Sequence, residues 1–197
     1  MKRIWLAILL LVWLGLAAQS TGFNFEGEKL DFHLRPDAKT GELIWELDGV
    51  YWFSNLSEEP LSQVIAFPVP SDSLCSEAQD LSLKIGSYGD STYVNLLNQW
   101  PQGFSFRLEA PQRRLVAVQI SYHQRLQGKT ARYVLMTTNS WGRALPLSEI
   151  SLRVDKSLRV KNISLSDYQL ESLEGEALFT WSLSDFVAAT DLIVELE

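Results

Sequence analysis

The side chains that most often carry catalysis are scarce in this sequence. It contains two histidines, His33 and His123, and a single cysteine, Cys75. Covalent catalysis requires a nucleophile beside a base that a third group orients. Each histidine falls on the polar side of an alternating apolar–polar segment, and Cys75 lies in a polar stretch with no basic neighbour that would lower its pKa. We therefore expect a protein that is not an enzyme and that has no catalytic residue.

Motifs for metal ions and nucleotides are also missing. The sequence contains neither H-E-x-x-H nor C-x-x-C, and its acidic clusters, Glu58-Glu59 and the glutamates within 171–176, are typical of solvated turns. It contains no G-x-G-x-x-G and no P-loop. The sequence therefore predicts no metal ion and no cofactor.

The tryptophans are the remaining candidates, because exposed aromatic rings can serve as platforms for sugars. Trp100 stands next to Pro101 in the segment LLNQWPQGF, whose composition predicts an exposed loop. We predict Trp100 as a ligand-binding residue, although a large aromatic ring more often fills the core or its ends. Four other tryptophans follow the N-terminal segment, namely Trp45, Trp52, Trp141 and Trp181.

Trp141 occupies a predicted corner between strands. Gly142 follows it directly and permits backbone geometries closed to other residues, and Pro146 restricts the chain before the next strand. We expect the indole to cover the open end of the core, since leaving it in water would forfeit its apolar burial. The alternative is an outward-facing ring that contacts a ligand.

The N-terminal segment MKRIWLAILLLVWLGLAA predicts a secretory signal peptide over residues 1–20. Lys2 and Arg3 precede an apolar run that is shorter than the roughly 20 residues needed to span a bilayer, and small residues follow. We expect an exported protein, periplasmic or extracellular, with no membrane span after cleavage of the leader. An uncleaved leader that anchors the chain in the membrane is the alternative.

The overall charge is acidic, with 17 basic and 24 acidic residues and a formal net charge of −7. Removal of the leader takes away two of the basic residues. An acidic surface without a polybasic patch repels nucleic acid, which we exclude as a partner.

Short alternating segments follow the leader and predict β-strands. In KLDFHL, residues Leu30, Phe32 and Leu34 share one face, and in RLVAVQISYHQ the apolar face recurs at every second position over 116–122. Several such strands separated by turns predict an all-β, antiparallel, immunoglobulin-like β-sandwich with little or no helix. We expect a single domain over residues 21–197. Two small sandwiches that meet near residue 112 are the alternative.

Two segments allow more than one interpretation. In ELIWELDGVYWFSN, Asp48-Gly49 could form a hairpin turn, but one long strand with a bulge at Gly49 is favoured. In the polar segment PSDSLCSEAQD, we expect Cys75 to be partly accessible. A single cysteine forms no internal disulfide, so the fold must depend on its buried core.

The stretch VYWFSNLSEEPLSQVIAFPVPSD reads as two strands joined by a polar turn. Tyr51–Leu56 is expected to form the first, and Leu61–Phe67 to return antiparallel until Pro68 and Pro70 end the pairing. Together with LSLKIG, this stretch resembles vault protein/inter-alpha-trypsin (VIT) domains over residues 50–86. The resemblance implies an extracellular β-sandwich that serves as a structural or interaction module, and it carries over no catalytic residue.

We therefore predict an exported, non-enzymatic β-sandwich that acts in protein–protein or envelope interaction. The expected partner is a protein or a glycan of the cell envelope. The alternative is a carbohydrate-binding module that uses Trp100.

Overall fold

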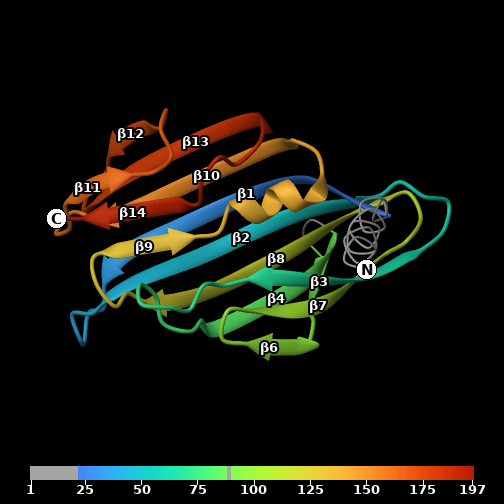
Figure 1. The fold of residues 1–197 in the computed structure, drawn as a ribbon, viewed down its shortest axis with the longest axis horizontal. Helices are drawn as coiled ribbons and strands as arrows, with labels where there is room; N and C mark the ends of the chain where they lie inside the picture. The colour runs from blue at the N-terminus through green and yellow to red at the C-terminus, as the bar shows by residue number, and fades with distance from the viewer. Residues whose placement is uncertain (1–21, 88–89) are drawn as a thin grey trace, which may run out of the picture.

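Two layers of β-sheet face each other in the computed structural model, which describes residues 22–87 and 90–197 (Figure 1). The predicted signal peptide lies outside the described residues. One layer is an eight-stranded sheet in the order β12-β13-β10-β1-β2-β8-β4-β5. Its strands are β1 (Phe23–Pro36), β2 (Leu43–Asn55), β4 (Gln79–Ser87), β5 (Asp90–Tyr93), β8 (Arg114–Arg125), β10 (Leu145–Asp155), β12 (Gln169–Ser172) and β13 (Glu176–Phe186).

The facing layer consists of two separate three-stranded sheets, in the orders β3-β7-β6 and β11-β14-β9. Their strands are β3 (Leu61–Pro68), β6 (Asn98–Trp100), β7 (Gly103–Ala110), β9 (Thr130–Tyr133), β11 (Val160–Ile163) and β14 (Leu192–Leu196). A 3-10 helix, η1 (Met136–Trp141), follows β9. Among the described residues, no helix is long and apolar enough to cross a membrane.

The predicted all-β sandwich is confirmed, with one pairing that the antiparallel expectation did not include. Strands β1 and β10 run parallel, with Gly27 opposite Leu147 and Leu34 opposite Val154. Because parallel neighbours need a long connection, the chain visits β2 to β9 before it returns to β10. In the large sheet β8 lies between β2 and β4, so strands from both sides of residue 112 are neighbours.

The alternating segments place their apolar faces in the core, as predicted. Leu30, Phe32 and Leu34 are fully buried, and so are Val118 and Ile120 of β8. Their alternate neighbours lie on the outer face of the large sheet. The two-residue period of a strand therefore separates a buried face from a polar face along the chain.

The segment around Asp48-Gly49 is one continuous strand, β2, as favoured. However, the pairing of β2 with both β1 and β8 runs through Asp48 and Gly49 without a register shift, so the predicted bulge at Gly49 is wrong. Glycine is needed here for space, because a Cβ at position 49 would lie 2.7 Å from the hydroxyl oxygen of Tyr51. The irregularity lies instead in β1, between Phe25 and Gly27.

The antiparallel return of Leu61–Phe67 onto the preceding strand is not what the structure shows. β3 pairs with β7 in the facing layer, and β2 pairs with β1 and β8. Because β1 and β8 occupy both edges of β2, β2 has no edge left for β3, and the buried Asn55 side chain holds the corner where the chain leaves the sheet. Its Nδ2 donates to the carbonyl oxygens of Glu59 at 2.8 Å and Pro111 at 3.0 Å, which ties the turn to the β7–β8 corner. β3 ends at Pro68, as predicted, but the missing N–H of Pro68 is not the reason, because position 68 points away from β7 and the Val69 N–H still donates to the Gln102 carbonyl oxygen at 3.0 Å.

The prediction that Cys75 is accessible is wrong, since its side chain is only 1% exposed. Cys75 forms a β-bridge with Leu126 at the end of β8. The buried Gln124 side chain holds the loop down, because its Nε2 donates to the carbonyl oxygens of Pro70 at 2.7 Å and Ser76 at 2.6 Å. A polar local composition carries no information about such contacts between residues far apart in the sequence.

We expect the Cys75 thiol to react with a maleimide only after the protein unfolds, because burial excludes the reagent and raises the pKa of the thiol. Mass spectrometry after timed labelling, with and without denaturant, measures this. The Cys75→Ala/Lys39→Cys variant is the control, since its thiol lies in an exposed turn and should react at once. Rapid labelling of native wild-type protein would contradict the buried position.

Candidate functional site

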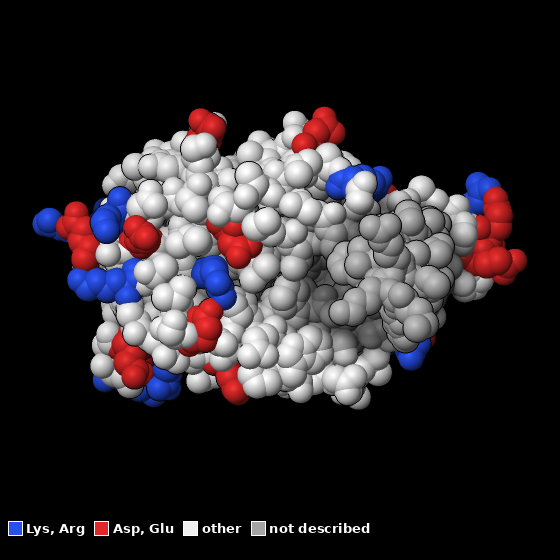
Figure 2. Space-filling model, viewed as in Figure 1, with Lys and Arg blue, Asp and Glu red and all other residues white. Residues whose placement is uncertain are grey.

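A cleft separates the two small sheets of the facing layer. β3 is the edge of one sheet and β9 the edge of the other, and they do not pair. We call the space between them the β3–η1 cleft. It has a cavity volume of about 300 Å³ and is lined by residues 63–68 of β3, by residues 133–141 of β9, η1 and their connection, and by inward side chains of β1, β2 and β8. Figure 2 views the face onto which the cleft opens, where the hollow near the centre is bordered on its described side largely by uncharged atoms.

The floor of the cleft depends on the bulge in β1. Phe25 pairs with Phe53 and Gly27 pairs with Trp52, so that Glu26 is an extra residue without a partner in β2. An extra residue reverses the alternation that follows it. Phe25 therefore points inward before the bulge, and Glu28 points inward after it.

Glu28 is a carboxyl group in an apolar layer. It lies between Tyr51 of β2 and Ser148 of β10 in the sheet register and is 1% exposed. Its Oε1 accepts a hydrogen bond from Ser148 Oγ at 2.8 Å. Burial raises the pKa of Glu28 to about 7, because the charged form loses its hydration, and the hydrogen bond from Ser148 opposes this shift only in part.

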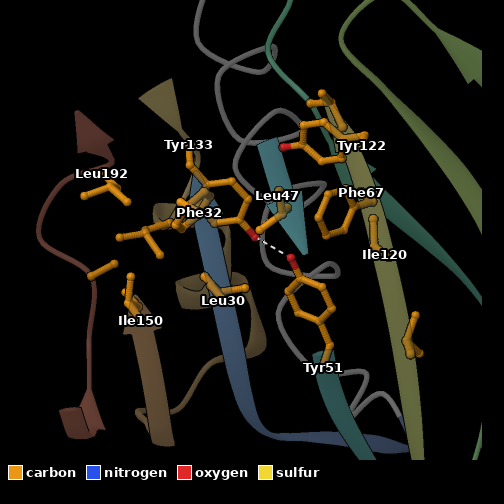
Figure 3. Packing of buried hydrophobic residues seen from close by; sticks show 14 of the residues in the cluster. Leu30, Phe32, Leu47, Tyr51, Phe67, Ile120, Tyr122, Tyr133, Ile150 and Leu192 are labelled. Carbon is orange, nitrogen blue, oxygen red and sulfur yellow. Dashed lines mark hydrogen bonds between the residues drawn. The ribbon is translucent and has the colours of Figure 1, made fainter. Parts of the chain in front are cut away.

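Two tyrosines join the layers beside Glu28. The hydroxyl groups of Tyr51 and Tyr133 share a hydrogen bond of 2.7 Å across the core (Figure 3). Burial raises the pKa of both tyrosines well above the usual value, and the nearby Glu28 acts in the same direction. Both hydroxyls are therefore neutral at physiological pH and act as hydrogen-bonding groups.

Aromatic rings form much of the remaining lining. Phe25 and Phe53 stack with ring centroids 5.0 Å apart, and the Trp141 ring lies 5.8 Å from Phe25 and 5.4 Å from Phe53. Trp141 is half-buried at the end of η1, so it covers the core only in part and forms one lip of the cleft. Phe67 of β3 contacts the Tyr51 ring edge-on at 5.4 Å.

The other lip is the outer edge of β3. The backbone N–H of Val69 donates to the backbone carbonyl oxygen of Gln102 at 3.0 Å, and this bond continues the β3–β7 ladder. Because backbone groups alternate in direction along an antiparallel strand, the N–H and C=O groups of Ser62, Val64 and Ala66 point away from β7. Within the described part of the chain, these groups have no strand partner.

Of the candidate residues from the sequence, Trp141 borders the cleft, whereas Trp100 and the two histidines lie elsewhere. Trp100 is in β6, at the far edge of the β3-β7-β6 sheet, where it is 37% exposed beside a separate hollow of about 340 Å³. His33 and His123 are on the outer face of the large sheet. His33 Nε2 lies 2.9 Å from Glu176, and His123 Nε2 lies 3.2 Å from Gln79. The structure does not bring either histidine to Cys75.

No metal centre is formed by the described residues, which contain no group of three or more His, Cys, Asp or Glu side chains placed to hold a metal ion. Sequence reasoning missed Glu28, because the simple alternation of FNFEGEKLDFHL does not show which residues face inward. Gly27 was the available signal, since an isolated glycine in a strand often marks a bulge.

Solved structures share this fold. No protein-family model matches the sequence, and no curated protein matches it. A candidate nutrient binding protein from Legionella pneumophila subsp. pneumophila str. Philadelphia 1 has a TM-score of 0.70 at 14% identity, over 90% of this chain and 68% of that chain. An M1 zinc metallopeptidase from Deinococcus radiodurans has a TM-score of 0.52 at 14% identity, over 88% of this chain, which spans 42% of the peptidase chain. At this identity the likenesses show the fold alone.

Glu28 should make the stability of the fold depend on pH. Its folded-state pKa of about 7 lies above the ordinary value of 4.5, so burial of the carboxyl destabilises the fold increasingly as pH rises from about 4.5 through 7. Relative to Glu28→Gln, the wild type should lose about 3 kcal/mol of unfolding free energy over that range. Chemical denaturation at several pH values measures the difference. The exposed Glu149→Gln serves as control, and an equal pH dependence of wild type and Glu28→Gln would contradict the burial of a titrating carboxyl.

Trp141→Ala should lower the free energy of unfolding by about 3 kcal/mol, because the ring packs on Phe25 and Phe53. The shift of the denaturation midpoint measures this effect. An unchanged midpoint would show that the ring contributes nothing to the core and would leave it a role at the lip of the cleft only.

Proposed function

We propose that this chain is an exported, non-enzymatic interaction module that binds an extended segment of a partner protein in the β3–η1 cleft. The segment adds to β3 as a further strand. The observation that carries this proposal is the outer edge of β3, whose backbone groups at Val64 and Ala66 lie along an aromatic cleft.

An unpaired strand edge is a template for strand addition. Native proteins usually protect such edges with charged residues, bulges or a covering element. The outward side chains of β3 are Ser62, Val64 and Ala66, none of which is charged, and Val64 is 48% exposed. Main-chain hydrogen bonds would supply affinity for an added strand, and alternate side chains of that strand would enter the cleft.

The length of β3 and the lining of the cleft suit such a segment. β3 spans eight residues and is therefore longer than a typical β-strand of about five to six residues. Below it, the rings of Phe25, Phe53 and Phe67 provide an apolar surface for inward side chains. A mostly apolar lining with a few polar groups is the usual composition of a binding site.

Two further observations support a binding role. The Legionella pneumophila neighbour is described as a nutrient binding protein candidate. The resemblance of residues 50–86 to VIT domains implies an interaction module. β3 is part of that resemblance. The absence of a catalytic motif in the sequence and the signal-peptide pattern complete the proposal of an exported, non-enzymatic module.

Carbohydrate binding at Trp100 is the second candidate. Its ring borders a hollow that also includes the polar side chains of Glu77 and Gln99. A partly exposed tryptophan beside polar groups is suited to the apolar face and hydroxyl groups of a sugar. A glycan array with wild-type protein and Trp100→Ala distinguishes this role from strand addition.

Peptide selection tests strand addition directly. Random peptides displayed on phage and selected on the wild-type protein should protect the amides of Val64 and Ala66 from hydrogen exchange. Val64→Pro should abolish binding of these peptides. Proline lacks the N–H that points away from β7 toward the added strand, and the β3–β7 ladder does not use this N–H.

Val64→Thr is the matched control, since it keeps the N–H and the branched shape and should bind normally. Far-ultraviolet circular dichroism and native protection of Cys75 verify that the proline variant is folded. Selected peptides that bind elsewhere, or that bind Val64→Pro equally well, would overturn the proposal.

A further inference from the structure

The β3–η1 cleft contains one acidic group and no basic group among the described residues that line it. The acid is Glu28, and the other polar lining residues are the tyrosines, Gln63 and the hydroxyl residues of η1. A buried carboxyl without a positive partner destabilises a fold once it is ionised. A positively charged group on a ligand would therefore stabilise the ionised form of Glu28.

The hydrogen bonding of Glu28 is also incomplete. Ser148 Oγ donates to Oε1, and within the described residues no other hydrogen bond to this carboxyl is formed. A carboxylate has about four acceptor positions on its two oxygens. Several acceptor positions of Glu28 are thus available to a donor that enters the cleft.

The route to Glu28 is lined by aromatic rings. Phe25, Phe53 and Trp141 form a cluster, and Phe25 also contacts Tyr51, whose ring contacts Phe67. Such rings pack against methylene groups, and their faces attract a positive charge. The lining therefore matches a long apolar stem that ends in a cation.

We propose that the β3–η1 cleft selects a lysine side chain of the bound segment, whose ammonium group hydrogen-bonds to Glu28 while its stem lies along the aromatic rings. This inference rests on the proposed strand addition and names the residue that the module recognises. In a strand paired with β3, every second side chain points toward the floor of the cleft. The acidic chain, with a net charge of −7, also attracts basic segments.

The geometry favours lysine over arginine. A guanidinium group binds a carboxylate best through two parallel hydrogen bonds to both oxygens. Ser148 already takes one of the two acceptor positions on Oε1 of Glu28, so a guanidinium bound to both oxygens would share Oε1 with Ser148. An ammonium group is a point charge with three donors and can bind Oε2 without displacing Ser148.

Binding of lysine should depend on pH. The ammonium attracts the ionised form of Glu28, which predominates above its pKa of about 7. The titratable groups that face Glu28 from the packed strands are Tyr51 of β2 and Tyr133 of β9, and both stay neutral because their pKa values are raised well above the usual value. β10 presents Ser148, β3 presents Gln63, and η1 presents hydroxyl groups, none of which titrates here.

Four synthetic peptides test the inference. Each has alternating valine and threonine around a central residue, which is lysine, arginine, norleucine or glutamate, and each carries a fluorescent label and blocked termini. Fluorescence anisotropy gives the dissociation constant at about pH 6 and about pH 8. We expect the lysine peptide to bind about tenfold more tightly than the norleucine peptide at about pH 8, and most of this advantage to vanish at about pH 6.

Glu28→Gln should remove the advantage of lysine over norleucine, and the exposed Glu149→Gln should keep it. A second measurement uses NMR of the Glu28 side-chain carboxyl, whose pKa should fall when the lysine peptide binds. Equal binding of lysine and norleucine, with sensitivity to Val64→Pro, would overturn the lysine inference and leave strand addition intact. If no peptide binds at β3, strand addition and the lysine inference both fail.

Discussion

The buried side chain of Asn55 fixes the corner at which the chain leaves the large sheet for the second layer. It lies at the end of β2, where its amide donates to carbonyl oxygens of the following turn and of the β7–β8 corner, and its Oδ1 accepts the N–H of Ser57 at 2.9 Å. β3 cannot return to β2, because β1 and β8 already occupy both edges of that strand. β3 instead joins β7, and the facing layer is left as two sheets with a cleft between them.

A second irregularity, the bulge in β1, places an ionisable group in this cleft. The extra residue in β1 reverses the alternation, so that Glu28 faces a core formed by Leu30, Phe32 and the tyrosine pair. A buried carboxyl destabilises a fold at neutral pH, and the hydrogen bond from Ser148 offsets only part of that effect. Such groups often occur at functional sites, where a ligand supplies the missing charge.

The shared sandwich does not by itself indicate a reaction or a ligand. It occurs in a candidate nutrient binding protein and within a larger M1 zinc metallopeptidase, each 14% identical to this chain. Function depends on side chains placed on the fold, and the function that we propose rests on those that line the β3–η1 cleft. The proposals of strand addition and lysine recognition both rest on properties of that cleft, namely a strand edge without a partner among the described residues, aromatic walls and one buried acid.

Local sequence determined the strands, because the two-residue alternation of 29–34 and 116–122 depends only on which residues follow each other in the chain. It also indicated that β3 ends at Pro68. Only the tertiary structure decided which strands pair. It also buried Cys75, in the loop that Gln124 holds, and placed Glu28 at the cleft. These features depend on hydrogen bonds and contacts between residues far apart in the sequence, and on a bulge that shifts the alternation by one position.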